Sequence, residues 1–212
     1  MSRPAPASGA PTFGTLLDIM TGGAESGALH FAERAGAVAF VTVLTAMAAQ
    51  VSVPLPFTPV PFTFQPMVVL VGAAVLGARL GMTSQLLYLA LGIAGLPVFA
   101  LSPLLPQGLA RLVGPTGGYL VSYPFAAFLV GALAERGMDR RYVTAVLAMA
   151  AGLASVYAFG VAWLAFVVRP ALGFTGALAA GFAPFVVPDV LKLALAAGVM
   201  PGLWWLAGPR TR

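Results

Sequence analysis

The chain has 212 residues, of which 60% are hydrophobic and only 8% are charged, eleven basic and six acidic. A soluble domain carries roughly 25% charged residues, so this composition excludes an ordinary soluble globule, and the apolar content excludes a disordered chain. The absence of cysteine excludes disulfides and thiolate metal sites. The net charge of +5 comes from basic residues that are scattered along the chain without a basic stripe, so nucleic-acid binding is not expected.

Long stretches without a charged residue predict membrane spans. The longest, residues 35–78, is interrupted by four prolines and has room for two transmembrane helices, since each needs roughly 20 apolar residues. We therefore predict an all-α integral membrane protein with six transmembrane helices. The expected spans, in chain order, are 32–51, 64–78, 82–97, 117–134, 143–167 and 183–206.

The first thirty residues differ in composition from the rest of the chain. Residues 1–30 are rich in glycine, serine, proline and alanine, and we expect a poorly ordered cytoplasmic segment there. The six-helix transmembrane domain is expected over residues 31–208. A basic stretch followed directly by an apolar one is missing from this segment, so no cleavable signal peptide is expected.

The arginines predict the orientation in the membrane. Cytoplasmic loops carry an excess of basic residues. With the N-terminus inside, eight arginines fall on the cytoplasmic side and two on the outer side, so both termini are expected in the cytoplasm (N-in/C-in). The eight are Arg3, Arg34, Arg79, Arg136, Arg140, Arg141, Arg210 and Arg212, and the two are Arg111 and Arg169.

The first expected outer connection, residues 53–65, holds four prolines and no charge. Proline has no N–H and a fixed φ, so this stretch cannot be helical and should be stiff and extended. Non-helical backbone at membrane depth occurs where it is buried in protein or lines a cavity. A plain hydrophobic hairpin at the membrane interface is an equal alternative.

The second outer connection, from Gly92 to Tyr119, is longer than most, and long loops are often lids or binding loops. Its Gly117-Gly118 pair would let the backbone approach a ligand or a neighbouring helix closely. A tight turn before a helix explains the same pair.

A charged pair lies inside the last expected span. Asp189 and Lys192 are three residues apart and therefore share a helix face. Charged groups inside a membrane are costly and by default indicate function, while a self-neutralising structural pair near the outer interface is the alternative. The pair shares its side of the membrane with the two unusual connections, which together predict a ligand pocket that opens outward.

Several kinds of catalysis are excluded. The sole histidine, His30, precedes the first span, which leaves no buried Ser–His pair. Only one aspartate falls in a span, so a paired-aspartate protease is excluded, and no cluster has metal-ligand spacing. No phosphate-binding Gly-Lys-Ser/Thr motif is present, so the chain does not itself hydrolyse ATP. The sequence predicts a binding protein and not an enzyme.

A set of segments in a fixed order is the most specific signal in the sequence. They are Val53-Pro54-Leu55-Pro56 with Pro59-Val60-Pro61-Phe62-Thr63-Phe64-Gln65, then Tyr88, Gly92 and Gly95-Leu96-Pro97-Val98-Phe99-Ala100, then Gly114-Pro115-Thr116-Gly117-Gly118-Tyr119-Leu120, Trp163-Leu164-Ala165, and Pro184-Phe185 with Asp189-Val190-Leu191-Lys192-Leu193. Together they resemble the BioY family, the biotin-specific substrate-binding (S) components of energy-coupling-factor (ECF) transporters. The resemblance covers residues 32–200. It departs from the family at Pro188, where glycine is usual, which could shift the start of the last helix.

This resemblance implies a function. It implies an S-component fold in the cytoplasmic membrane that captures biotin from outside with high affinity and takes it up. The implied partners are a transmembrane coupling protein and ATP-binding subunits that hydrolyse ATP, so no cofactor is expected in this chain. Whether the chain forms a homo-oligomer is left open. The alternative from another class is a self-sufficient secondary carrier or channel for a small vitamin-like solute.

The resemblance also implies a site. The ionised Asp189 can accept an N–H of the biotin ureido ring, and Gln65 or Thr63 can bond to the other polar groups of that ring. The biotin carboxylate needs a cation, for which Arg111 and Lys192 are the candidates. Aromatic side chains, Phe62 and Phe64 among them, could form the wall around the apolar part. The predicted substrate-binding residues are Thr63, Gln65, Tyr88, Phe99, Arg111, Tyr119, Asp189 and Lys192.

Overall fold

A computed structural model describes residues 14–21, 27–102, 106–168, 171 and 173–207 of the chain. The described part is mostly helical. In chain order the elements are α1 (Leu16–Met20), α2 (Gly27–Gln50), β1 (Ser52–Val53), β2 (Phe62–Thr63), α3 (Gln65–Leu76), α4 (Ala78–Ile93), α5 (Ala110–Val113), α6 (Gly117–Glu135), α7 (Tyr142–Trp163), the π-helical turn η1 (Leu164–Val168), α8 (Gly173–Gly181) and α9 (Val186–Leu206).

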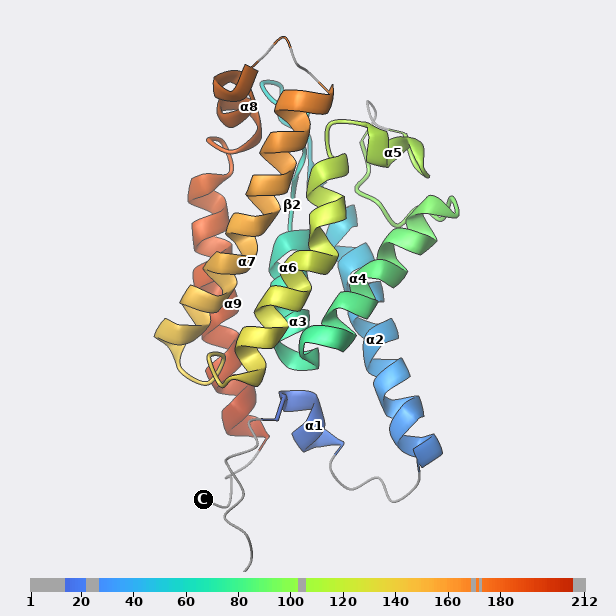
Figure 1. Cartoon of the computed structure of the whole chain (residues 1–212), viewed down its shortest axis with the longest axis vertical. Helices are drawn as coiled ribbons and strands as arrows, with labels where there is room; N and C mark the ends of the chain where they lie inside the picture. Colours follow the sequence, from blue (N-terminus) through green and yellow to red (C-terminus); the bar gives the residue numbers. More distant parts are fainter. Residues whose placement is uncertain (1–13, 22–26, 103–105, 169–170, 172, 208–212) are drawn as a thin grey trace, which may run out of the picture.

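The long helices form a bundle with α6 at its centre (Figure 1). Helix α6 packs against α3, α4 and α7, while α9 packs on α3 and α7. Close packing depends on small residues: a Cβ on Gly131 of α6 would overlap the backbone at the start of α4. The short helices α5 and α8 lie at one end of the bundle, and α1 and the last turn of α9 lie at the other (Figure 1).

The predicted spans overlap α2, α3, α4, α6, α7 and α9. The third is displaced, since it was predicted over 82–97 and α4 runs from Ala78 to Ile93. In the described part of the chain, α2, α6, α7 with η1, and α9 are long and apolar enough to cross a membrane. Helix α3 has 12 residues and α4 has 16, so these two are shorter than a full span. The structure therefore supports a helical protein with several membrane-spanning helices.

The proline-rich connection between α2 and α3 is non-helical, as predicted, but it is not one extended segment, because it turns at residues 56–57 and folds back on itself. Its ends pair as the short antiparallel strands β1 and β2, with Ser52 opposite Thr63 and Val53 opposite Phe62. The sequence did not predict this pairing. Val60 and Thr63 are buried and line a pocket described below, which decides between the two alternatives in favour of a segment that lines a cavity.

The N-terminal segment differs from the prediction. We expected residues 1–30 to be poorly ordered, but within them α1 is a capped helix, with Thr15 and Asp18 bonding to each other's backbone amides. Leu16 and Leu17 are buried, and Asp18 forms an ion pair with Arg34 of α2 at 3.0 Å. These contacts with the bundle give α1 the stability that its own composition does not. Residues 27–30, which also belong to the predicted segment, form the first turn of α2. Residues 1–13 and 22–26 lie outside the described residues.

Pro188, at the position where the family usually has glycine, leaves the last helix intact. Helix α9 begins at Val186, which puts Pro188 in its first turn. The N–H groups of a first turn have no partner within the helix, so proline is tolerated there. Asp189 is the first residue after it to bond to the preceding turn, with its amide donating to the Phe185 carbonyl at 2.8 Å.

Candidate substrate-binding site

A pocket lies among the β1–β2 hairpin (residues 52–63), the connection from α4 to α6, and helices α7 and α9. It holds about 610 Å³ of empty space, part of which is open to the outside. Most of its wall is apolar or aromatic, with a few charged and polar groups, as expected of a site for a small organic molecule. Seven of the eight predicted residues line it, namely Thr63, Gln65, Phe99, Arg111, Tyr119, Asp189 and Lys192.

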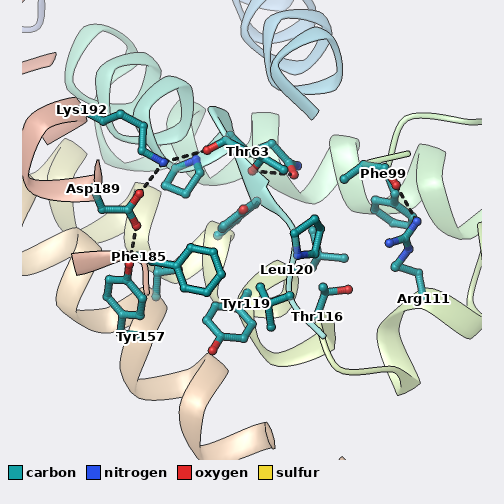
Figure 2. A pocket seen from close by; sticks show the side chains of 17 residues that line it. Thr63, Phe99, Arg111, Thr116, Tyr119, Leu120, Tyr157, Phe185, Asp189 and Lys192 are labelled. Carbon is teal, nitrogen blue, oxygen red and sulfur yellow. Dashed lines mark hydrogen bonds and ion pairs between the residues drawn. The ribbon is translucent and has the colours of Figure 1, made fainter. Parts of the chain in front are cut away.

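One end of the pocket is built on the first turns of α9. Asp189 and Lys192 are both buried and form an ion pair with each other. The Lys192 ammonium also donates to the Thr63 carbonyl at 2.8 Å and lies 4.0 Å from the centre of the Phe62 ring. The hairpin and α9 are thereby joined through this lysine, as Figure 2 shows.

Tyr157 of α7 completes this end, and the sequence did not predict it. Its hydroxyl donates to the carboxylate oxygen of Asp189 that does not face Lys192 (Figure 2). Its ring packs edge-on against Phe182, with centroids 4.8 Å apart. The only signal in the sequence is a hydroxyl within an apolar span, where it needs a partner. Asp189 thus accepts from two directions before any ligand binds.

A polar chain supports the middle of the pocket. The Thr63 hydroxyl donates to the Gln65 side-chain oxygen at 3.4 Å, and the Gln65 amide donates to the Tyr88 hydroxyl at 2.6 Å. Tyr88 then donates to the Val98 carbonyl at 3.2 Å. We predicted that Tyr88 contacts the ligand, but in the structure Tyr88 does not line the pocket. It lies behind Gln65 and fixes the loop that carries Phe99.

Phe99 is held in place by the close approach of a helix. A Cβ on Gly92 of α4 would overlap the Phe99 ring, which packs edge-on against Tyr88 with centroids 5.5 Å apart. The Phe99 carbonyl accepts from Gln107 at 3.3 Å. Phe99 is therefore a fixed part of the pocket wall.

Arg111 lies at the opposite end of the pocket from Asp189 (Figure 2). It is 1% exposed, and its guanidinium donates to the Pro106 carbonyl at 2.7 Å and to the Ala100 carbonyl at 2.6 Å. These two bonds to loop carbonyls orient the guanidinium. Burial lowers the pKa of Arg111, but an arginine stays protonated in proteins.

The Gly117-Gly118 pair permits a close approach of helices, one of the two uses predicted for it. A Cβ on Gly118 would overlap Trp163 of α7, and the Trp163 indole donates to the Gly114 carbonyl at 3.0 Å. Tyr119 follows the pair, and its hydroxyl donates to the Gly181 carbonyl at the end of α8 at 2.8 Å. These contacts attach α7 and α8 to the start of α6.

The helical bundle and its pocket define a class: a helical membrane protein that binds a small molecule between its helices. Within that class the chain belongs to the BioY family, whose family model matches residues 20–208. Its resemblance to this family is therefore confirmed.

Individual relatives agree with this assignment. The chain is 41% identical over 165 residues to "Probable biotin transporter BioY" of Pyrococcus horikoshii, across 78% of this chain and 92% of that protein. It is 41% identical over 156 residues to "Biotin transporter BioY" of Thermotoga maritima, across 74% and 86%. Both relatives are named as transporters and not as enzymes.

A solved structure has the same fold. A crystal structure of the S-component for biotin from an ECF-type ABC transporter aligns with a TM-score of 0.76, covering 86% of this chain and 95% of that one at 24% identity. The predicted S-component fold is thus confirmed at the level of the fold.

Proposed function

We propose that this chain is the biotin-binding S component of an ECF-type transporter and takes up biotin across the cell membrane. The observation that carries the proposal is the pocket with a carboxylate at one end and a guanidinium at the other, in a chain of the BioY family. The names of its relatives and of the solved structure support biotin as the substrate.

The ureido ring of biotin is assigned to the Asp189 end. That ring has two N–H donors and one carbonyl acceptor, and an ionised carboxylate accepts strongly from N–H groups. Asp189 is buried beside apolar and aromatic side chains, where such bonds are not weakened by water. Gln65 and Thr63 are within the same pocket and supply the remaining polar contacts.

The carboxylate of biotin is assigned to Arg111. Of the two cations considered, Lys192 already pairs with Asp189 and donates to the hairpin. Arg111 lies at the other end of the pocket, and a guanidinium matches a carboxylate geometrically. Phe99, Tyr119 and Phe185 line the space between the ends and would contact the apolar part of biotin.

The arrangement in the membrane is also part of the proposal. Six helices cross the cell membrane, with α3 and α4 as the two short ones and both termini in the cytoplasm. The eight-to-two distribution of arginines supports this orientation, and α1 and the end of α9 lie at the same end of the bundle (Figure 1). A coupling protein and ATP-binding subunits would supply the energy, so this chain needs no cofactor of its own.

Ligand binding to the purified protein tests the function. Biotin should raise the midpoint of thermal unfolding, because a ligand that binds only the folded state stabilises it. Thiamin and riboflavin should leave the midpoint unchanged. Equal shifts for the three vitamins, or no shift with biotin, would reject biotin as the substrate.

A transport assay distinguishes an S component from a self-sufficient carrier. Uptake of biotin into vesicles that also contain the coupling protein and its ATP-binding subunits should require ATP inside and survive an uncoupler. Uptake by this chain alone that an uncoupler abolishes would favour the carrier.

A further inference from the structure

One hydroxyl in the pocket has no hydrogen-bond partner within the protein. Thr116 precedes α6, is 7% exposed and lines the pocket. In the part of the chain that the structure describes, its Oγ1 bonds to nothing. A buried polar group without a partner is rare in folded proteins and calls for an explanation.

The other buried hydroxyls of serine and threonine show how unusual this is. Within the described residues, six buried serines and threonines donate a hydrogen bond to a neighbouring oxygen, namely Thr15, Thr42, Thr45, Thr63, Ser84 and Ser122. The hydroxyl of the half-buried Ser52 has no partner either. Of these two unpartnered hydroxyls, Thr116 is the one that lines the pocket.

The Thr116 side chain also does not cap α6. Threonine at the position before a helix commonly adopts extended backbone and accepts a bond from an amide of the first turn. Thr116 instead has φ −90° and ψ −5°, and its side chain makes no capping bond. The first bond of α6 runs from the Leu120 amide to the Thr116 carbonyl, 3.1 Å. The amides of Gly118 and Tyr119 precede it, where helix N–H groups have no partner within the helix.

The surroundings of Thr116 are positive. Figure 2 places it at the end of the pocket where Arg111 lies. The start of a helix carries partial positive charge and attracts anions. A hydroxyl donor, a guanidinium and a helix N-terminus at one end of a pocket together fit a carboxylate.

We propose that the Thr116 hydroxyl, at the positive start of α6, donates to the carboxylate of the bound ligand beside Arg111. This inference rests on the proposed function, in which the ligand is biotin. It assigns Thr116 a binding role and explains why its hydroxyl is left without an internal partner.

The test replaces Thr116 by valine, which keeps the shape and removes the hydroxyl, and uses two probes, biotin and biotinamide. A hydrogen bond to a charged group is stronger than one to a neutral group. Thr116→Val should therefore weaken biotin binding about tenfold to a hundredfold, and biotinamide binding distinctly less. Thr116→Ser should keep most of the affinity for biotin.

Two controls separate binding from structure. Ser122→Ala removes a buried hydroxyl on the same helix that donates to the Tyr119 carbonyl at 2.6 Å and is outside the pocket, so biotin affinity should not change. The melting temperature of ligand-free Thr116→Val should be unchanged or higher, because the lost hydroxyl made no internal bond.

The outcomes are distinct. Equal losses for biotin and biotinamide, or a lowered ligand-free melting temperature with unchanged affinity, would overturn the role of Thr116 and leave biotin as the ligand. A wild-type protein that does not bind biotin would overturn the proposed function and this inference with it.

Discussion

The two ends of the pocket are charged in different ways. At the α9 end, Asp189 is bonded to Lys192 and Tyr157 within the protein. At the other end, Arg111 is oriented by the neutral carbonyls of Ala100 and Pro106. The first end holds a carboxylate paired with an ammonium, whereas the second presents a guanidinium that loop carbonyls orient. We infer that the first end selects the ligand by the geometry of its hydrogen bonds, and the second by a guanidinium that matches a carboxylate.

The largest effect is expected at the Arg111 end. Removing one partner of a buried charged contact typically costs 2–5 kcal/mol or more, so Arg111→Gln should reduce biotin affinity by about a hundredfold, as measured by calorimetry. The preference for biotin over biotinamide should disappear in this variant. Arg79→Gln, an exposed arginine on α4, is the matched control and should leave affinity unchanged. Retained preference for the acid would place its carboxylate elsewhere.

At the opposite end, Asp189→Asn should weaken biotin binding about tenfold to a hundredfold, because it removes a charged acceptor and presents an N–H donor toward the ureido N–H groups. It should also lower the melting temperature without ligand, since Lys192 is left buried without its counter-ion.

The double variant Asp189→Asn/Lys192→Met separates these effects. Replacing both members of a buried pair by neutral groups can restore stability, so the melting temperature should recover while biotin affinity stays low. Recovery of both would mean that the pair is structural and that the ureido ring binds elsewhere.

A smaller effect is expected from Tyr157→Phe. The variant keeps the ring against Phe182 and removes the hydroxyl that holds Asp189. We expect about a tenfold loss of biotin affinity, since the orientation of the carboxylate is less restricted. Tyr142→Phe, at the half-exposed start of the same helix, serves as its control. A loss for both variants alike would point to a general effect on α7.

Much of this site could be predicted from local sequence. Asp189 and Lys192 are three apart on one helix, so their proximity needs no knowledge of the fold. The prolines before α3 exclude a helix by themselves. Uncharged stretches located the four long helices α2, α6, α7 and α9 and the shorter α3 and α4, because the cost of charge in a membrane acts on every residue of a span.

The missed contacts depend on tertiary packing. The bond from Tyr157 to Asp189 joins α7 to α9, and a lone tyrosine in an apolar span resembles one that anchors at the membrane interface. Tyr88 was expected to line the pocket but lies behind Gln65. Spacing along the chain does not show which of two neighbouring side chains faces the cavity. Helix α1 was missed because its stability comes from buried Leu16 and Leu17.

The most direct test of the two-ended pocket is an experimental structure with biotin bound. The account predicts ureido nitrogens within about 2.7–3.2 Å of the Asp189 carboxylate, and the biotin carboxylate at a similar distance from Arg111. Biotin in the reverse orientation, or bound outside this pocket, would contradict it.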